Sequence, residues 1–177
     1  MFYISKVATS APSTFKSQLQ HEVYALLDRL HINYERVDTD EAITMDDCIA
    51  IDAALDMKMV KTLFLCNRQK TQFYIFVTTA DKPFSSKDFS HALGISRVSF
   101  APAELLLSML GSPVGAATAL SVVSAPDNVE YVFDKDVLSQ STYGCSDGTN
   151  TCYMKLHIDD VFNLFKAAGR DWKVVEL

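Results

Sequence analysis

Residues 61–78 read KTLFLCNRQKTQFYIFVT, and this stretch decides the fold. Two runs rich in aromatic and aliphatic residues, 61–66 and 72–78, flank the polar residues 67–71. Apolar runs of this length on either side of a short polar tip are typical of the two strands of a β-hairpin. We therefore expect strands over 61–66 and 72–78, joined by a turn at 67–71.

Short helices and strands alternate on both sides of this hairpin. Ser13 and Thr14 are candidate caps for a first helix, and Thr44 precedes a second helix whose expected inward side chains are Ile49, Ala53 and Leu55. The expected helices are 15–31, 45–56, 85–93, 103–110 and 159–168, and the further strands are 34–37, 98–100, 129–133, 150–156 and 174–175. This order predicts an α/β fold of the α+β type, with a mixed, mainly antiparallel sheet flanked by short helices.

Length and composition favour one domain over residues 1–177, because 177 residues with 49% hydrophobic content suit a single sizeable core. No apolar run approaches the roughly 18 residues of a membrane span. The N-terminal segment lacks the continuous apolar stretch of a signal peptide. A cytoplasmic protein is therefore expected.

Charge is unevenly spread along the chain. The net charge is -6, yet residues 58–97 hold seven Lys and Arg side chains against two Asp, a balance of +5. An acidic chain is a poor general nucleic-acid binder, but its basic middle segment could form one polyanion-binding face. The alternative is a solvated hairpin with ordinary surface lysines.

Several common kinds of site are not indicated by the sequence. Cys145 and Cys152 are seven residues apart, without a CxxC pair or a neighbouring His, so we expect free thiols and no metal site. There is no phosphate-binding loop, no dinucleotide fingerprint and no serine-hydrolase or zinc-protease motif. A cysteine nucleophile would need a His partner that the sequence does not place.

Three other features could carry chemistry. Lys61 opens a very apolar strand, 111–118 is a loop of small residues, and 144–151 is a loop of polar residues. A loop rich in small residues can present backbone N–H groups to a carbonyl oxygen that becomes negatively charged, and the polar loop could orient water. The alternative is that the glycines only make turns and that Lys61 only extends its ammonium group to solvent.

The order and spacing of these features resemble the YbaK/ProX-like aminoacyl-tRNA editing domains over about residues 18–172. The likeness is greatest to the free-standing prolyl-tRNA trans-editing branch, which removes misattached alanine from proline tRNA. Its core is KMVKTLFLCNR at 58–68, SRVSFA at 96–101 and GCSDGTNTCYMKL at 144–156. The other matching segments are 34–38, 44–46, 81–84, 110–120 and 132–136. The resemblance implies the fold of these domains and of the prolyl-tRNA synthetase insertion.

The resemblance also implies site residues. Lys61 is expected to hold the 3′-terminal adenosine or the ester end of the tRNA. The backbone of Gly115, Ala116, Ala117 and Thr118 is expected to face the scissile carbonyl. Substrate contacts are expected from Thr44, Ala119, Ser146, Asp147 and Asn150. This chain departs from the family pattern at Ala119, where a proline is usual, and at Ser146-Asp147, where His-Pro is usual. Asp147 could hold the α-ammonium group of the amino acid, and Asn150 could anchor the loop.

The leading hypothesis is thus a trans-editing deacylase that hydrolyses the ester of a mischarged tRNA, with Ala-tRNA(Pro) as the expected substrate. Its expected partner is the 3′ acceptor end of tRNA(Pro), with no membrane or DNA partner and with neither metal nor organic cofactor. One alternative is a catalytically weakened module that binds tRNA or an aminoacyl ligand. Another is a regulator of amino-acid metabolism that senses a free amino acid.

Overall fold

The hairpin predicted from 61–78 lies inside a five-stranded sheet of the computed structural model, which describes all 177 residues. β2 (Val60–Cys66) and β3 (Phe73–Thr79) pair antiparallel. The strand order is β4-β2-β3-β5-β8, with β4 (Ser99–Phe100) antiparallel to β2. β5 (Val129–Asp134) and β8 (Lys173–Val175) join in parallel. Side chains on both faces of β2 and β3 are buried, in two different apolar clusters, which explains the near-continuous hydrophobic runs.

A second sheet of three strands stands beside the first. Its order is β1-β7-β6, all antiparallel, formed by β1 (Glu35–Asp38), β7 (Cys152–His157) and β6 (Thr142–Ser146). A parallel bridge between Met59 and Gly144 links the two sheets. The prediction of a mixed, mainly antiparallel sheet is confirmed, although the strands divide between two sheets.

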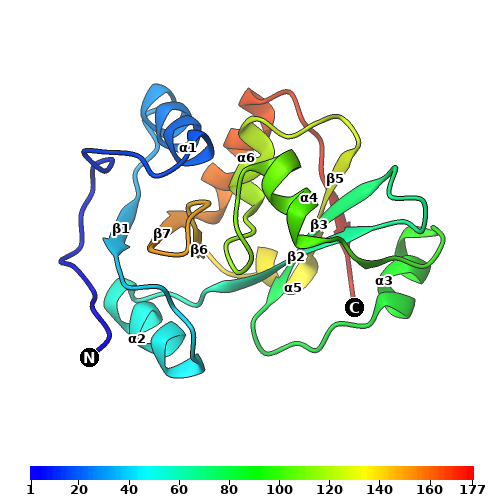
Figure 1. Cartoon of the computed structure of the whole chain (residues 1–177), viewed down its shortest axis with the longest axis horizontal. Helices are drawn as coiled ribbons and strands as arrows, with labels where there is room; N and C mark the ends of the chain where they lie inside the picture. Colours follow the sequence, from blue (N-terminus) through cyan, green and yellow to red (C-terminus); the bar gives the residue numbers. More distant parts are fainter.

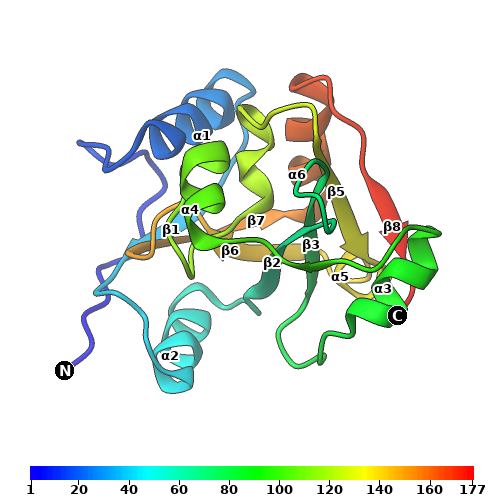
Figure 2. The ribbon, with the colours of Figure 1, turned by 45° about the vertical axis from the view of Figure 1, so that its right-hand side comes forward.

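Helices cover both faces of these sheets (Figures 1 and 2). In Figure 2, α1, α4 and α6 lie above the strands, and α2 and α3 lie below them. Their bounds are α1 Gln18–Arg29, α2 Met45–Leu55, α3 Ser86–Leu93, α4 Ala103–Leu105, α5 Lys135–Leu138 and α6 Ile158–Ala167. A π-helix, η1 (Leu106–Leu110), continues α4, and η2 (Ala119–Val123) is a 3-10 helix.

Strand alternation assigns the apolar side chains to different parts of the core. Phe64 and Ile75 belong to the large cluster that packs with α1 and α6. Leu65 and Phe76 point the other way, into a smaller cluster with Phe89 of α3. A third cluster joins α2 to the three-stranded sheet through Tyr153 and its neighbours. The buried residues of both sheets therefore contact helices on two sides.

Two sequence-based expectations about helices are wrong. The first helix begins only after Ser17, whose hydroxyl accepts from the N–H of Gln20 at 3.0 Å, so neither Ser13 nor Thr14 caps it. In α2, Ile51 and Leu55 are buried, whereas Ile49 and Ala53 are exposed. Apolar residues occur all round this short helix, so the sequence does not show which of them face inward. Packing against the three-stranded sheet buries Ile51 and Leu55.

No helix in the structure combines the length and apolar character that a membrane crossing requires.

The end of β5 holds a buried ion pair. The carboxylate of Asp134 is 1% exposed and lies 2.7 Å from the ammonium nitrogen of Lys82. It also accepts from the hydroxyl of Thr78 at 2.7 Å and from the N–H of Asp136 at 3.0 Å. Burial alone would raise the pKa of the Asp134 carboxyl, but Lys82 and these hydrogen bonds together lower the pKa below its ordinary value.

This ion pair predicts a pH-dependent contribution to stability. A lowered folded-state pKa stabilises the protein above the unfolded pKa of Asp, about 3.9, and the contribution is lost as pH falls through the folded value. Asp134→Asn should therefore be less stable than the wild type at pH 7, and the difference should narrow below about pH 4. Urea unfolding of both proteins at neutral pH and at a pH of about 3.5 measures this, and a difference independent of pH would contradict it.

Candidate active site

A small cavity opens at the seam between the two sheets. Its volume is about 230 Å³. Its walls come from the start of β2, the loop before η2, the end of β6 and one residue of β7: Met59, Val60, Lys61, Thr62, Gly115, Ala117, Cys145, Ser146 and Tyr153. β4 pairs with β2 only at Leu65 and Cys66, so the start of β2 has an open edge here. The three features singled out in the sequence therefore meet in one place.

The small-residue loop enters the cavity through a tight turn. The N–H of Ala116 donates to the carbonyl of Pro113 at 3.1 Å, and Gly115 at the third turn position has φ +86°. A type II turn requires such a left-handed φ, which glycine adopts without strain. The amides of Gly115 and Ala117 donate to no acceptor in the protein. This loop thus brings two unpaired backbone donors to the cavity, where they can meet a ligand oxygen.

Lys61 also lines the cavity. It lies on β2 opposite Thr78 of β3, and its side chain is half-buried. Its ammonium group donates to the backbone carbonyl of Lys82, in the loop after β3. An ammonium has three donors, so two remain for a ligand at the cavity. The cavity lining therefore includes both a lysine and two residues with free backbone amides.

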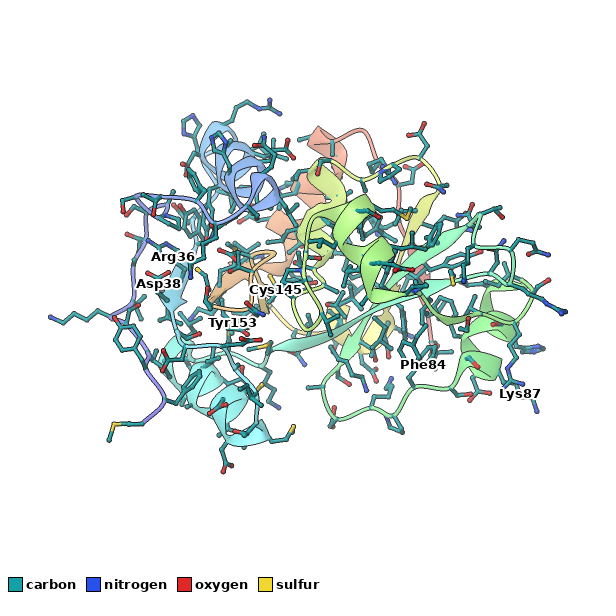
Figure 3. The ribbon with its side chains drawn as sticks, viewed as in Figure 1. Arg36, Asp38, Phe84, Lys87, Cys145 and Tyr153 are labelled. Carbon is teal, nitrogen blue, oxygen red and sulfur yellow. The ribbon has the colours of Figure 1, made fainter.

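Strand β6 contributes Cys145 and Ser146 to the cavity lining, and β7 contributes Tyr153. Cys145 and Tyr153 are labelled in Figure 3. Burial raises the pKa of the Cys145 thiol far above its ordinary value. The thiol stays protonated at neutral pH and is a poor nucleophile. Burial likewise raises the pKa of Tyr153 to about 12. The Ser146 hydroxyl donates to the carbonyl of Thr149 and accepts from the N–H of Gly148 at 3.1 Å.

Asp147 does not line this cavity, unlike its neighbour Ser146. Its side chain is completely buried on the α1 side of the strand end. One carboxylate oxygen accepts from Gln20 Nε2 and from the hydroxyl of Tyr24, both at 2.8 Å. The other accepts from the N–H and hydroxyl of Thr149, at 3.1 and 2.7 Å. The carboxylate that was expected to bind an ammonium group is thus fully used in joining the 146–149 turn to α1.

The other expected site residues also lie outside the cavity lining. Thr44 caps α2, where its hydroxyl accepts from the N–H of Asp47 at 3.2 Å. Ala116 and Ala119 are fully buried. Thr118 caps η2 with its hydroxyl.

Asn150 is not part of the cavity lining either. Its Nδ2 donates to Glu41 Oε1 at 3.1 Å, so the side chain ties the turn to the segment before α2. Of the ten expected site residues, the structure brings Lys61, Gly115, Ala117 and Ser146 together.

Five cavity residues were missed as site residues in the sequence: Met59, Val60, Thr62, Cys145 and Tyr153. Cys145 was missed because 144–151 was interpreted as a loop, whereas the first three residues of this segment end β6. Gly144 hid the strand, because glycine is rare inside strands. A Cβ at this position would lie 2.5 Å from Met57 Sδ. The glycine permits the close approach of β6 to the chain entering β2, and so shapes the seam.

No cluster of three or more His, Cys, Asp or Glu side chains in the structure has the arrangement of a metal site. A larger hollow of about 830 Å³ lies elsewhere, lined by His31, Lys155 and His157 among others, and contains none of the expected site residues.

Comparison with known proteins decides the family. The model of the aminoacyl-tRNA editing domain matches residues 42–164, which include all nine cavity residues. The chain belongs to the aminoacyl-tRNA editing domain family. Members of this family are aminoacyl-tRNA deacylases, and they act on aminoacyl-tRNA. The resemblance noted in the sequence is thereby confirmed, and so is its prolyl-tRNA editing character, by the relatives described next.

Two relatives align over most of this editing-domain protein. It is 30% identical over 156 residues to the prolyl-tRNA editing protein ProX of Acetoanaerobium sticklandii, an alignment that covers 88% of this chain and 95% of ProX. It is 27% identical over 160 residues to the mouse prolyl-tRNA synthetase associated domain-containing protein 1, covering 88% and 94% of the two chains. A solved structure described as a candidate trans-editing enzyme for prolyl-tRNA synthetase has the same fold, with a TM-score of 0.66, 16% identity and coverage of 92% and 98%.

Proposed function

We propose that this protein is a trans-acting deacylase that hydrolyses the ester between a small misattached amino acid, alanine in the first place, and the 3′ end of tRNA(Pro). The observation that carries the proposal is the cavity at the sheet seam, whose lining includes Lys61 together with Gly115 and Ala117, two residues with unpaired amides. The similarity to ProX, a prolyl-tRNA editing protein, supports the choice of tRNA.

The cavity suits a small amino acid. Its volume of about 230 Å³ is below the roughly 300 Å³ at which pockets for drug-sized ligands begin. Met59, Val60 and Ala117 give it apolar walls that fit a methyl side chain. Size alone separates neighbouring amino acids by only about 1–3 kcal/mol per methylene, so alanine should be preferred over larger residues more sharply than over glycine.

The proposed chemistry uses backbone donors and a substrate hydroxyl. The amides of Gly115 and Ala117 stabilise the negative charge that develops on the carbonyl oxygen of the ester when water attacks. Lys61 holds the terminal nucleotide by charge. Neither Cys145 nor Tyr153 is ionised at neutral pH, so neither acts as the base. The terminal ribose hydroxyl of the tRNA, together with an ordered water, takes that part, as in substrate-assisted editing.

The decisive experiment incubates the protein with Ala-tRNA(Pro) and follows loss of the ester, alongside a panel of other mischarged tRNAs. Ester loss well above the spontaneous rate, greatest for alanine, is expected. Loss for another small amino acid but not alanine would keep the reaction and change the substrate. A gel shift with no turnover for any substrate would favour the binding module, and a free amino acid that raises the melting temperature would favour the sensor.

A basic groove at the far end of β2 supports contact with the tRNA beyond the cavity. It is lined by Arg68 and Arg97 around Phe100, which is 62% exposed. Cys66, beside this groove, is five residue steps along the strand from Lys61, or about 17 Å at 3.3 Å per step. An unpaired nucleotide chain can cover that span. Exposed aromatic rings stack on bases and arginines bind phosphates, so the groove suits a nucleic-acid strand.

The groove yields a prediction about salt. The double variant Arg68→Ala/Arg97→Ala should raise KM for the tRNA substrate several-fold and leave kcat nearly unchanged, because neither arginine touches the cavity. The slope of log affinity against log salt should become shallower by about one for each phosphate that the variant no longer binds. Arg29→Ala removes one positive charge from the end of α1, outside this groove, and is the control for a general charge effect. An unchanged salt slope would remove this groove from the tRNA path.

A further inference from the structure

The loop after β3 contains the backbone carbonyl that accepts a hydrogen bond from the Lys61 ammonium. Residues 80–84 leave β3 and turn back at once, with the N–H of Lys82 donating to the carbonyl of Thr79 at 3.2 Å. The carbonyl of Lys82 then accepts from Lys61 Nζ. A lysine side chain has many rotamers, and holding it in one of them has an entropic cost. This carbonyl is the only protein acceptor of the Lys61 ammonium in the structure.

The loop is itself anchored by the side chain of the same residue. Lys82 Nζ lies 2.7 Å from carboxylate oxygens of both Asp134 and Asp136, and 3.0 Å from the carbonyl oxygen of the C-terminal residue Leu177. These three acceptors match the three N–H donors of an ammonium group. Lys82 therefore has no donor left for a tRNA phosphate, although its sequence position lies in the basic segment 58–97.

We propose that Lys82 is a positioning residue for Lys61: its side chain fixes the 80–84 loop on Asp134 and Asp136, and its backbone carbonyl thereby holds the Lys61 ammonium at the cavity. The proposal rests on the proposed function for its effect on catalysis, but its structural part can be tested without any activity. The order of contacts runs from the end of β5, through the Lys82 side chain, to the Lys82 carbonyl and then to Lys61 Nζ on β2.

The catalytic test is a double-mutant cycle. Lys82→Met keeps the carbonyl and removes the anchor, so kcat/KM should fall about tenfold. The kcat/KM of Lys61→Ala should be lower still. The double variant should have a kcat/KM no lower than that of Lys61→Ala, because substitutions of two residues that act through one contact do not have additive effects. Lys82→Arg should recover part of the loss. Lys173→Met removes another ion pair of the same sheet, with Glu130 at 3.1 Å, and should leave kcat/KM unchanged.

The structural test measures Lys61 directly. Each protein is treated briefly with an acylating reagent for amines, and the labelling rate at every lysine is read by mass spectrometry. Lys61 should label slowly in the wild type and several-fold faster in Lys82→Met, but not in Lys173→Met. If Lys82→Met fails to fold, Asp136→Asn loosens the same anchor while the buried Asp134 keeps its partner. Equal Lys61 labelling in the wild type and in the folded anchor variant would overturn the proposal, whatever the deacylation assay shows.

Discussion

Lys61→Ala is expected to lower kcat/KM for Ala-tRNA(Pro) about 100-fold. Lys61 is the one cationic residue of the cavity lining, which also includes Gly115 and Ala117 with their unpaired amides. Lys61 is proposed to hold the terminal nucleotide, and misplacing a reacting group by about 1 Å can reduce the rate about 10²-fold. Single-turnover deacylation separates the effect on chemistry from the effect on tRNA binding.

The matched variants decide what Lys61 contributes. Lys61→Met keeps most of the side-chain volume and should be nearly as impaired as Lys61→Ala, because the charge is what matters. Lys173→Ala, on the edge strand β8, should behave as the wild type. A Lys61→Ala protein with wild-type turnover would exclude Lys61 from the reaction, and the free amides would then have to account for it alone.

Asp147→Ala is expected to have the largest effect on stability, about 3 kcal/mol in the free energy of unfolding. The substitution removes the acceptor of four hydrogen bonds from buried donors of Gln20, Tyr24 and Thr149, and only the Tyr24 hydroxyl keeps another contact, with Cys152 Sγ at 3.4 Å. Each buried polar group left unpaired costs about 1–3 kcal/mol. Urea unfolding at neutral pH measures the difference.

Two further variants make the interpretation specific. Asp147→Asn keeps the shape but turns an amide N–H₂ toward neighbouring donors. It should lower the free energy of unfolding by less than Asp147→Ala does, but by a measurable amount. Asp171→Ala removes an exposed carboxylate and should change stability by less than about 0.5 kcal/mol. If Asp147→Ala were as stable as Asp171→Ala but inactive, the carboxylate would belong to the substrate site and not to the framework.

Much of the fold was predictable because its signals are local. The hairpin at 61–78 has long apolar runs with a polar tip, and the structure contains it with one-residue shifts at the ends. β6 was not predictable in the same way. Its residues 142–146 contain a glycine whose purpose is the approach of Met57, a residue distant in the sequence and outside β6. Contacts of that kind leave no periodic pattern.

The candidate site was predictable in part for a similar reason. Family resemblance pointed to Lys61, Gly115 and Ser146, and the structure places all three on one cavity. It also pointed to Asp147, which faces the opposite way. Strand alternation does not explain this, because the consecutive residues Cys145 and Ser146 both line the cavity. Asp147 follows the end of β6 directly, and its carboxylate is buried against α1. The partners that it meets, Gln20 and Tyr24, are set by tertiary packing.

The Met59–Gly144 bridge has a consequence for how substrate preference can change over evolutionary time. The cavity lies where two separate sheets meet, so its width depends on how closely they approach. That spacing depends on the close approach of the Met57 side chain to Gly144, where a larger residue would not fit. A substitution at either position would widen or narrow the space for an amino acid while every residue that touches it stayed the same. Related proteins with identical cavity walls can therefore reject different amino acids.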